Sequence, residues 1–207
     1  MTRRQPRRSL SRARSTVSRR EFLVFTEGET EDGYLVYWRR EFRDTAVVTV
    51  DDFHGGPLQL VDRAVEAKRR EAREQRRSQG KAHDEVWCVF DRDEHPNFAQ
   101  ALDKAGANGI GVAISNPCIE LWFVLHFADQ TAFLERGDAQ HRSRELLGCE
   151  KVLTPDALEH LGQRYEDARK RAQDLDTKHE GDGSPPRSNP SSSLWKLIDR
   201  IRDSASK

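Results

Sequence analysis

The sequence predicts an α/β protein with a mostly parallel four-stranded sheet sandwiched by helices. Three observations support this fold class: four short apolar runs lie between residues 22 and 114, helical periodicity separates each run from the next, and the runs are continuously apolar rather than alternating. Strands of a parallel sheet are buried on both faces and are joined by helical crossovers, so they show this pattern.

Each expected strand is followed by a turn and then by a segment with apolar residues three to four positions apart. Residues 22–26 form the first strand, and Tyr34, Leu35 and Trp38 mark the buried face of the helix that follows it. The other strands are expected at residues 46–50, 85–90 and 109–114, and the other crossover helices at residues 58–77 and 98–105.

Beyond the fourth strand the sequence predicts helices. An apolar helix is expected at residues 119–127 and charged helices at residues 138–176. Residues 180–193 are rich in Gly, Ser, Pro and Asn and are expected to form a loop. A final helix is expected to start near Ser191.

The first twenty residues contain eight of the 35 basic residues of the chain and no acid. Arginine mixed with Ser and Pro does not fold alone, which predicts a disordered arm. Such an arm suits a polyanion, because guanidinium groups displace counterions from phosphates; a solubility tail is the alternative. The candidate nucleic-acid contacts are Arg3, Arg4, Arg7 and Arg8. The expected organisation is a basic arm at residues 1–20, a core at 21–130 and a helical extension packing on that core at 131–207.

We expect neither a secretory signal nor a membrane-spanning segment in this sequence. Residues 9–18 lack the apolar stretch of a secretory signal, and no apolar run approaches the roughly twenty residues that span a bilayer. The three cysteines, Cys88, Cys118 and Cys149, have no CxxC spacing, which argues against a disulfide framework. We expect a cytoplasmic protein without a membrane partner.

Acidic residues directly follow two of the expected strands. Glu27 comes after the first strand; Asp91 and Asp93 come after the third, two positions apart, so that both carboxylates can reach one side of the strand end. Ligands of parallel α/β sheets collect at this edge. Three carboxylates there predict a Mg²⁺ or Mn²⁺ site for phosphodiester chemistry, because hard oxygen ligands suit these cations. The alternatives are a helix-capping role for Glu27 and solvated loop positions for the two aspartates.

Further polar residues lie near the same edge of the expected sheet. Glu120 falls in the first turn of the apolar helix after the fourth strand, where a buried carboxylate needs a metal or an arginine as its partner. His54, at the end of the second strand, is placed to meet a phosphate. We expect Glu31 to support the first helix rather than bind metal, and His126 to be a hydrogen-bonded core histidine.

Several motifs resemble a known family. Glu27-Gly28 after the first strand and Asp91-Arg92-Asp93 after the third are similar to the Glu and DxD motifs of the Toprim domain, found in topoisomerases, primases and OLD-type nucleases. More specifically, three segments resemble the RloB-like family, and the resemblance runs from about residue 20 to residue 202. They are Glu-Gly-Glu-Thr-Glu at 27–31, Asn-Pro-Cys-Ile-Glu-Leu-Trp-Phe-Val-Leu-His-Phe at 116–127 and Asn-Pro-Ser-Ser at 189–192.

The resemblance implies a Toprim-like catalytic core and a metal-dependent nuclease of RNA, such as tRNA, or of DNA. The catalytic residues would be Glu27, Asp91, Asp93 and Glu120, with the first three as ligands of Mg²⁺ or Mn²⁺. The resemblance also implies a role in anti-phage defence beside an ABC-type ATPase partner. Two other functions stay open: a non-catalytic adaptor or effector subunit, and a primase-like nucleotidyl-transfer enzyme, for which no glycine-rich nucleotide motif is present.

Overall fold

Five strands form a single sheet in the residues that the computed structural model describes, which are 19–92 and 95–205. The strands are β1 (Arg20–Thr26), β2 (Ala46–Val50), β3 (Glu85–Asp91), β4 (Gly111–Asn116) and β5 (Ser191–Ser192). Their order is β2-β1-β3-β4-β5; the first four strands are parallel, and β5 is antiparallel to β4. The α/β class and the mostly parallel sheet are therefore confirmed.

The expected number of four strands is wrong, because the segment 180–193 contributes a fifth. β5 consists of two serines that pair with the last two residues of β4, and the hydroxyl oxygens of Ser115 and Ser192 lie 2.9 Å apart. Two polar residues in a Ser- and Pro-rich segment carry no hydrophobic period, so nothing local marks them as a strand. The last helix accordingly begins after this strand, at Leu194.

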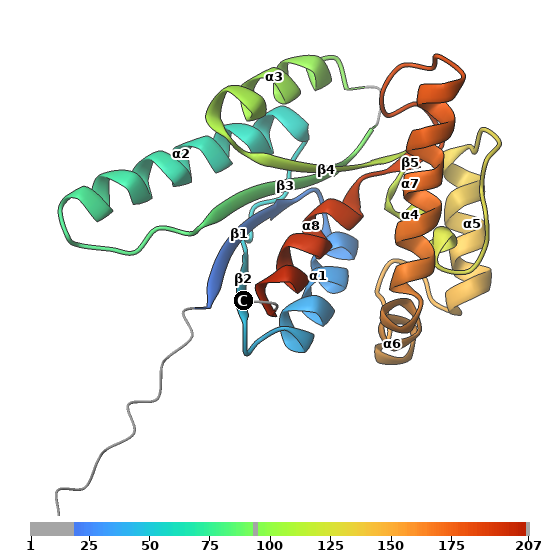
Figure 1. Ribbon diagram of the computed structural model, residues 1–207, viewed down its shortest axis with the longest axis horizontal. Coiled ribbons are helices and arrows are strands. Elements are labelled where there is room, and N and C mark those ends of the chain that lie inside the picture. Colours follow the sequence, from blue (N-terminus) through green and yellow to red (C-terminus); the bar gives the residue numbers. More distant parts are fainter. Residues whose placement is uncertain (1–18, 93–94, 206–207) are drawn as a thin grey trace, which may run out of the picture.

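Helices cover both faces of the sheet (Figure 1). On one face lie α2 (Pro57–Arg76) and α3 (Phe98–Asn108), and on the other lie α1 (Glu29–Glu41) and α8 (Leu194–Arg202). A second group gathers at one end of the sheet and consists of α4 (Ile119–Leu125), α5 (Arg136–Leu147), α6 (Pro155–Gln163) and α7 (Tyr165–Gly181). None of the helices in the described ranges combines the length and apolarity that a membrane span requires.

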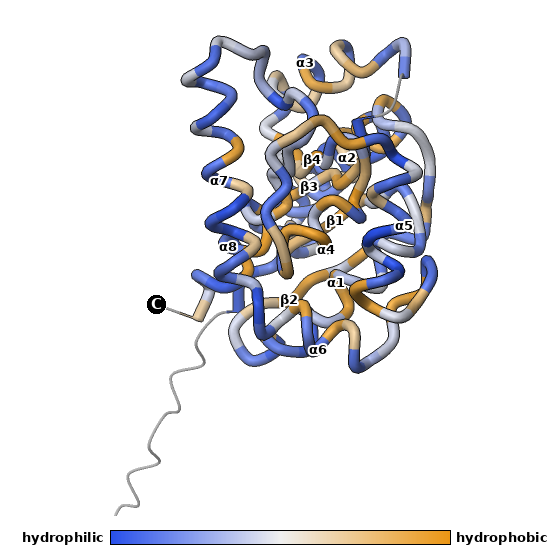
Figure 2. The backbone as a smooth tube through the Cα atoms, turned by 90° about the vertical axis from the view of Figure 1, so that its right-hand side faces the viewer, coloured by the Kyte–Doolittle hydropathy of each residue, from blue (hydrophilic) through white to orange (hydrophobic). Residues whose placement is uncertain are grey.

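The side chains of β1 show why the strands are apolar along their whole length. Phe22 and Val24 belong to the hydrophobic cluster formed with α1, α4 and α8, whereas Leu23 and Phe25 belong to the cluster formed with α2 and α3. Successive side chains of a strand point to opposite faces, so a strand covered on both faces is a continuous apolar run. Figure 2 shows apolar segments inside the molecule and polar segments on its outer helices.

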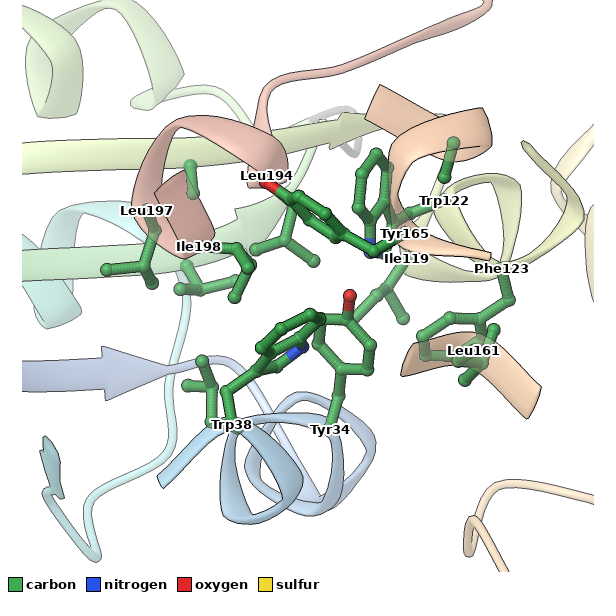
Figure 3. Packing of buried hydrophobic residues seen from close by; sticks show 14 of the residues in the cluster. Tyr34, Trp38, Ile119, Trp122, Phe123, Leu161, Tyr165, Leu194, Leu197 and Ile198 are labelled. Atoms are coloured by element: carbon green, nitrogen blue, oxygen red, sulfur yellow. The ribbon is translucent and has the colours of Figure 1, made fainter. Parts of the chain in front are cut away.

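The larger cluster contains aromatic side chains from helices far apart in the sequence (Figure 3). Trp38 of α1 and Tyr165 of α7 meet edge to face, with 4.9 Å between their ring centroids, and Trp122 of α4 packs against the same tyrosine. Such aromatic contacts add about 0.5–1.5 kcal/mol each beyond the burial of area. The helices after residue 131 therefore share a hydrophobic core with the sheet.

Candidate functional site

A cavity of about 320 Å³ lies at the carboxyl ends of β1 and β3, beside the first turns of α1 and α4. Ligands of parallel α/β sheets bind at this edge. The structure brings three of the predicted catalytic residues, Glu27, Asp91 and Glu120, into this one cavity, together with the predicted phosphate contact His54. Its charged lining residues are the acids Glu27, Glu29, Glu31, Asp91 and Glu120 and the cations Arg136 and Lys151.

Glu27 links the ends of the two strands. Its backbone N–H donates to Val89 O (3.1 Å), and its Oε2 accepts a hydrogen bond from the backbone N–H of Asp91 (2.9 Å). Its other carboxylate oxygen, Oε1, lies 3.7 Å from His95 Nε2. The Glu27 carboxylate is thus held against the end of β3, and it makes no capping hydrogen bond to α1, whose N-cap residue is Gly28.

Asp91 is the most deeply buried of the five acids, with 4% of its surface exposed. Its Oδ2 accepts a hydrogen bond from the Arg136 guanidinium (3.1 Å), whereas its Oδ1 has no hydrogen-bond partner among the described residues. Burial, and after it the charges of Glu31 and Glu27, raise the pKa of Asp91 well above its usual value. A buried carboxylate oxygen without a partner is costly unless a cation or a proton compensates it.

Glu31, which was expected to support α1 rather than to bind metal, lines the cavity and is 6% exposed. Burial, together with the charges of Glu27 and Glu120, raises its pKa to about 7. The sequence contained a signal for this position. Glu31 lies three and four residues before Tyr34 and Leu35, which are buried positions of α1, so helical periodicity already places it on the inner face.

Glu120 stands in the first turn of α4 and is only half-buried. The expectation that this carboxylate is buried is therefore wrong, whereas a metal or an arginine as its partner stays a prediction. Its charge still acts on its neighbours and contributes to the raised pKa of both Asp91 and Glu31. Helical periodicity alone does not distinguish a position that faces a cavity from one that faces a packed core.

The two histidines singled out in the sequence have different environments. His54 lines the cavity, and its Nε2 lies 2.9 Å from Asp32 Oδ2, so a residue of α1 orients it. His126 is 1% exposed and donates from Nδ1 to Trp122 O (2.8 Å), and burial lowers its pKa to about 3. It is a neutral core histidine, as expected.

Arg136 was not singled out in the sequence, although it contacts the centre of the site. It is the first residue of α5, and its guanidinium lies 3.1 Å from Asp91 Oδ2. Together with Lys151 it adds positive charge to a largely acidic cavity. Its partner is 45 residues away in the sequence, and nothing local distinguishes this arginine from the others in the same charged segment.

Several predicted site residues lie outside the described residues, namely Asp93 and the arm residues Arg3, Arg4, Arg7 and Arg8. Within the described ranges, no three or more His, Cys, Asp or Glu side chains come close enough together to hold a metal ion. Proteins commonly bind Mg²⁺ through one or two carboxylates, with waters and substrate phosphate as the further ligands. The unpartnered Oδ1 of Asp91 beside Glu27 fits such a site.

The two Asn-Pro segments of the sequence lie side by side, because β5 pairs with the end of β4. Asn116 Nδ2 donates to Arg187 O (2.8 Å), and the Asn189 side chain bonds both the N–H and the C=O of Leu134 (2.9 Å each). Arg92, next to Asp91 in the sequence, donates to the same Arg187 oxygen (2.6 Å). The C-terminal segment thus holds the ends of β3 and β4 in place.

The fold and the cavity define a class of protein: a mostly parallel α/β protein with an acidic cavity at the carboxyl edge of its sheet. Residues 22–201 match the RloB-like protein family, and the chain belongs to this family, which confirms the resemblance. No curated protein and no solved structure gives a significant match to the chain. The relationship to Toprim and OLD-type proteins therefore rests on the motifs alone.

Proposed function

We propose that this RloB-like protein is a metal-dependent nuclease with a Toprim-like core that hydrolyses structured RNA, such as tRNA, with DNA as the alternative substrate. The proposal is supported above all by the convergence of Glu27, Asp91 and Glu120 on one cavity, where an oxygen of Asp91 is buried and has no partner among the described residues. Acids held together against their mutual repulsion are typical of functional sites.

Glu27, Asp91 and Asp93 would hold Mg²⁺ or Mn²⁺, which supplies Lewis-acid polarisation of the phosphate and activation of a water molecule. Arg136 would bind the phosphate. Its side chain is 43% exposed, so once a cation compensates Asp91 the guanidinium can turn from this carboxylate to a phosphate oxygen. His54, oriented by Asp32, lines the same cavity and offers its second ring nitrogen to the substrate.

The choice of RNA, the role in anti-phage defence and the ABC-type ATPase partner follow from the family resemblance. The acids accept any phosphodiester, so the surrounding surface must select the substrate. Within the described ranges Phe133 is the one exposed aromatic side chain. A platform of stacked aromatics, as single-strand binders use, is therefore not available in this part of the chain, and recognition of shape and backbone is favoured.

The second candidate is a non-catalytic adaptor or effector subunit of an ATPase complex. A primase-like nucleotidyl transferase would use the same acids and is distinguished by incorporation of nucleotides.

The test is incubation of the purified protein with total cellular RNA and with plasmid DNA, in Mg²⁺, Mn²⁺ or EDTA, with and without its ATPase partner. Cleavage that requires the cation, is lost in Asp91→Asn and is retained in Asp103→Asn supports the proposal; Asp103 is exposed on α3 and serves as the matched control. Cleavage of DNA with intact RNA would refute the RNA preference. Nucleotide incorporation would favour the transferase, and no cleavage under any condition would favour the adaptor.

A further inference from the structure

The outer side of α2 carries a cluster of arginines at the end remote from the cavity. All are exposed, and at about 3.6 residues per turn they fall within an arc of about 120° on the helix. This arc is opposite to the side that α2 buries against the sheet. The members of this cluster, which we call the arginine face, are Arg69, Arg70, Arg73, Arg76 and Arg77.

The arginine face lacks the acidic partners that arginines have elsewhere in the described residues, where ion pairs such as Arg169–Asp199 (2.8 Å) and Arg200–Glu85 (2.6 Å) are common. Arg69 donates to Asn108 Oδ1 (3.1 Å). The other four make no side-chain hydrogen bond or ion pair to another described residue. Their positive charge is therefore available to a partner molecule.

The charge on the outer side of α2 changes sign along the helix. Nearer its start, Asp62 pairs with Lys104 of α3 (2.5 Å) and Glu66 is exposed. In the second half, Glu71 faces the protein and lies 2.8 Å from His83 Nδ1, and Glu74 is half-buried beside the arginines. Arg63, nearer the start of the helix, is exposed but pairs with Asp51 (2.9 Å). The unpaired positive charge is thus concentrated on the arginine face, which is about 12 Å long at about 1.5 Å per residue.

The start of β1 lies at the same end of the sheet as the arginine face. The segment after α2 leads into β3 at Glu85, which is in register with Phe22 near the start of β1. Lys81 in this segment forms an ion pair with Glu21 of β1. Arg19 and Arg20, with which the described part of the chain begins, therefore lie at the end of the sheet where the arginine face lies.

α2 connects the cavity to the arginine face. The helix starts at Pro57, three residues after His54, which lines the cavity. At about 1.5 Å per residue, Arg70 and Arg77 lie about 20 Å and about 30 Å further along the axis. Figure 1 shows α2 running from the side of α4 and α5 towards the opposite end of the molecule.

We propose that the arginine face binds the phosphate backbone of a double-helical arm of the RNA, about 20–30 Å from the bond that is cut. The identity of the ligand rests on the nuclease function proposed above. Guanidinium groups bind phosphates through two hydrogen bonds, and a row of them on one helix matches successive phosphates of a strand. These contacts position the substrate without reading its sequence.

The composition of this surface favours a nucleic acid over a protein partner. The cores of protein interfaces are rich in aromatic and apolar residues. Among the described residues, the exposed large hydrophobic side chains are Val36, Phe133, Leu146 and Val152, and none of them lies on α2.

The test compares the wild type with the triple variant Arg70→Ala, Arg73→Ala, Arg77→Ala for binding to a long RNA hairpin and to a DNA hairpin of the same sequence. Fluorescence anisotropy in EDTA, over a series of salt concentrations, measures binding without cleavage. The matched control is Arg39→Ala, Arg40→Ala, Arg43→Ala, which removes three exposed arginines at and just after the end of α1, on the other face of the sheet.

For RNA we expect the triple variant to lose affinity by on the order of tenfold or more. The slope of log K against log salt concentration should become shallower by about two to three, because each lost phosphate contact removes about 0.7–0.9 from this slope. The control should change far less. An unchanged affinity and slope in the triple variant, or an equal loss in the control, overturns the proposal. Loss of binding to the DNA hairpin alone would also overturn it, because the occupant would then be DNA.

This experiment stays informative if the nuclease proposal fails, because binding is measured without turnover. If cleavage is observed, the triple variant should raise KM for long hairpins and leave kcat unchanged, as expected for contacts remote from the reacting phosphate. A fall in kcat with an unchanged KM would instead show that the arginines act through the cavity, against the proposal.

Discussion

The two ends of the sheet place their charges in opposite environments. At the carboxyl end, Asp91 is 4% exposed and Glu31 is 6% exposed, with further acids beside them. At the other end, the arginine face is open to solvent. Like charges repel strongly inside a protein and weakly in salt water. The buried acids at the carboxyl end therefore destabilise the fold unless a ligand compensates their charge, whereas the exposed arginines have little effect on stability. Buried like charges therefore favour a ligand that compensates them, whereas exposed ones remain available to a charged partner.

A substitution at the carboxyl end should have the largest effect. Glu27→Gln keeps an oxygen that can accept the hydrogen bond from the Asp91 N–H, so the fold is retained while the cavity loses one negative charge. We expect cleavage to fall at least about 100-fold, because loss of even an indirect supporter of a metal ligand costs 10–100-fold. The rise in Tm on addition of Mg²⁺ should also disappear. Cleavage assays and thermal denaturation with and without Mg²⁺ measure both effects; a full metal response in the variant would place the cation elsewhere.

A buried titratable group away from the cavity separates the effect of burial from that of repulsion. Burial lowers the pKa of His126 to about 3, from about 6.5 in the unfolded chain. As the pH falls below about 6.5, only the unfolded state takes up a proton at this histidine. The free energy of unfolding is therefore highest above this pH and falls by about 1.4 kcal/mol per pH unit below it, which amounts to about 2 kcal/mol at pH 5. Urea denaturation of the wild type and of His126→Leu between about pH 5 and pH 6.5 should show this fall in the free energy of unfolding in the wild type and not in the variant. Equal slopes would mean that His126 does not remain neutral in the folded state.

Removal of one buried acid tests the repulsion directly. Above about pH 7, where the Glu31 carboxyl is ionised in the folded state, Glu31→Gln should stabilise the metal-free protein by about 1–2 kcal/mol, because a buried carboxylate near other acids is replaced by a neutral group of the same shape. Glu29→Gln, an exposed residue of the same cavity, is the matched control and should leave stability nearly unchanged. Denaturant titration in EDTA gives both values. A loss of stability in Glu31→Gln would show that this carboxylate is satisfied in the fold.

The smallest effect on stability is expected at the arginine face. The triple variant Arg70→Ala, Arg73→Ala, Arg77→Ala should change the free energy of unfolding by less than about 0.5 kcal/mol, because exposed side chains without partners add little and alanine favours helix. Thermal denaturation at low and at moderate salt checks this. A loss of more than about 1 kcal/mol would assign these arginines a structural role and would remove the contrast between the two ends.

The sequence predicts the first four strands and their crossover helices because the signals are local. The apolar run 22–26 and the spacing of Tyr34, Leu35 and Trp38 depend only on neighbours along the chain. The predicted positions of Glu27 and Asp91 at strand ends also follow from this pattern, since the carboxyl ends of parallel strands meet at one edge. Periodicity could also have placed Glu31 on the inner face of α1.

Other parts of the site depend on residues that meet across long stretches of sequence. Arg136 reaches Asp91 over 45 residues, and β5 joins the sheet through two serines without an apolar period. Glu120 was expected to be buried and is half-buried, because its neighbours across the cavity, and not its own helix, set its exposure.

The sequence by itself determined the α/β class, the order of the first four strands along the chain and the acids at two strand ends, because backbone period and strand-end position are properties of short segments. Only the tertiary structure decided which charges are compensated. Asp91 has Arg136 on one oxygen and no described partner on the other, while the arginine face has almost no partners among the described residues. The energy of a charge depends on the dielectric and on the charges within a few ångströms, and folding brings these together from distant parts of the chain.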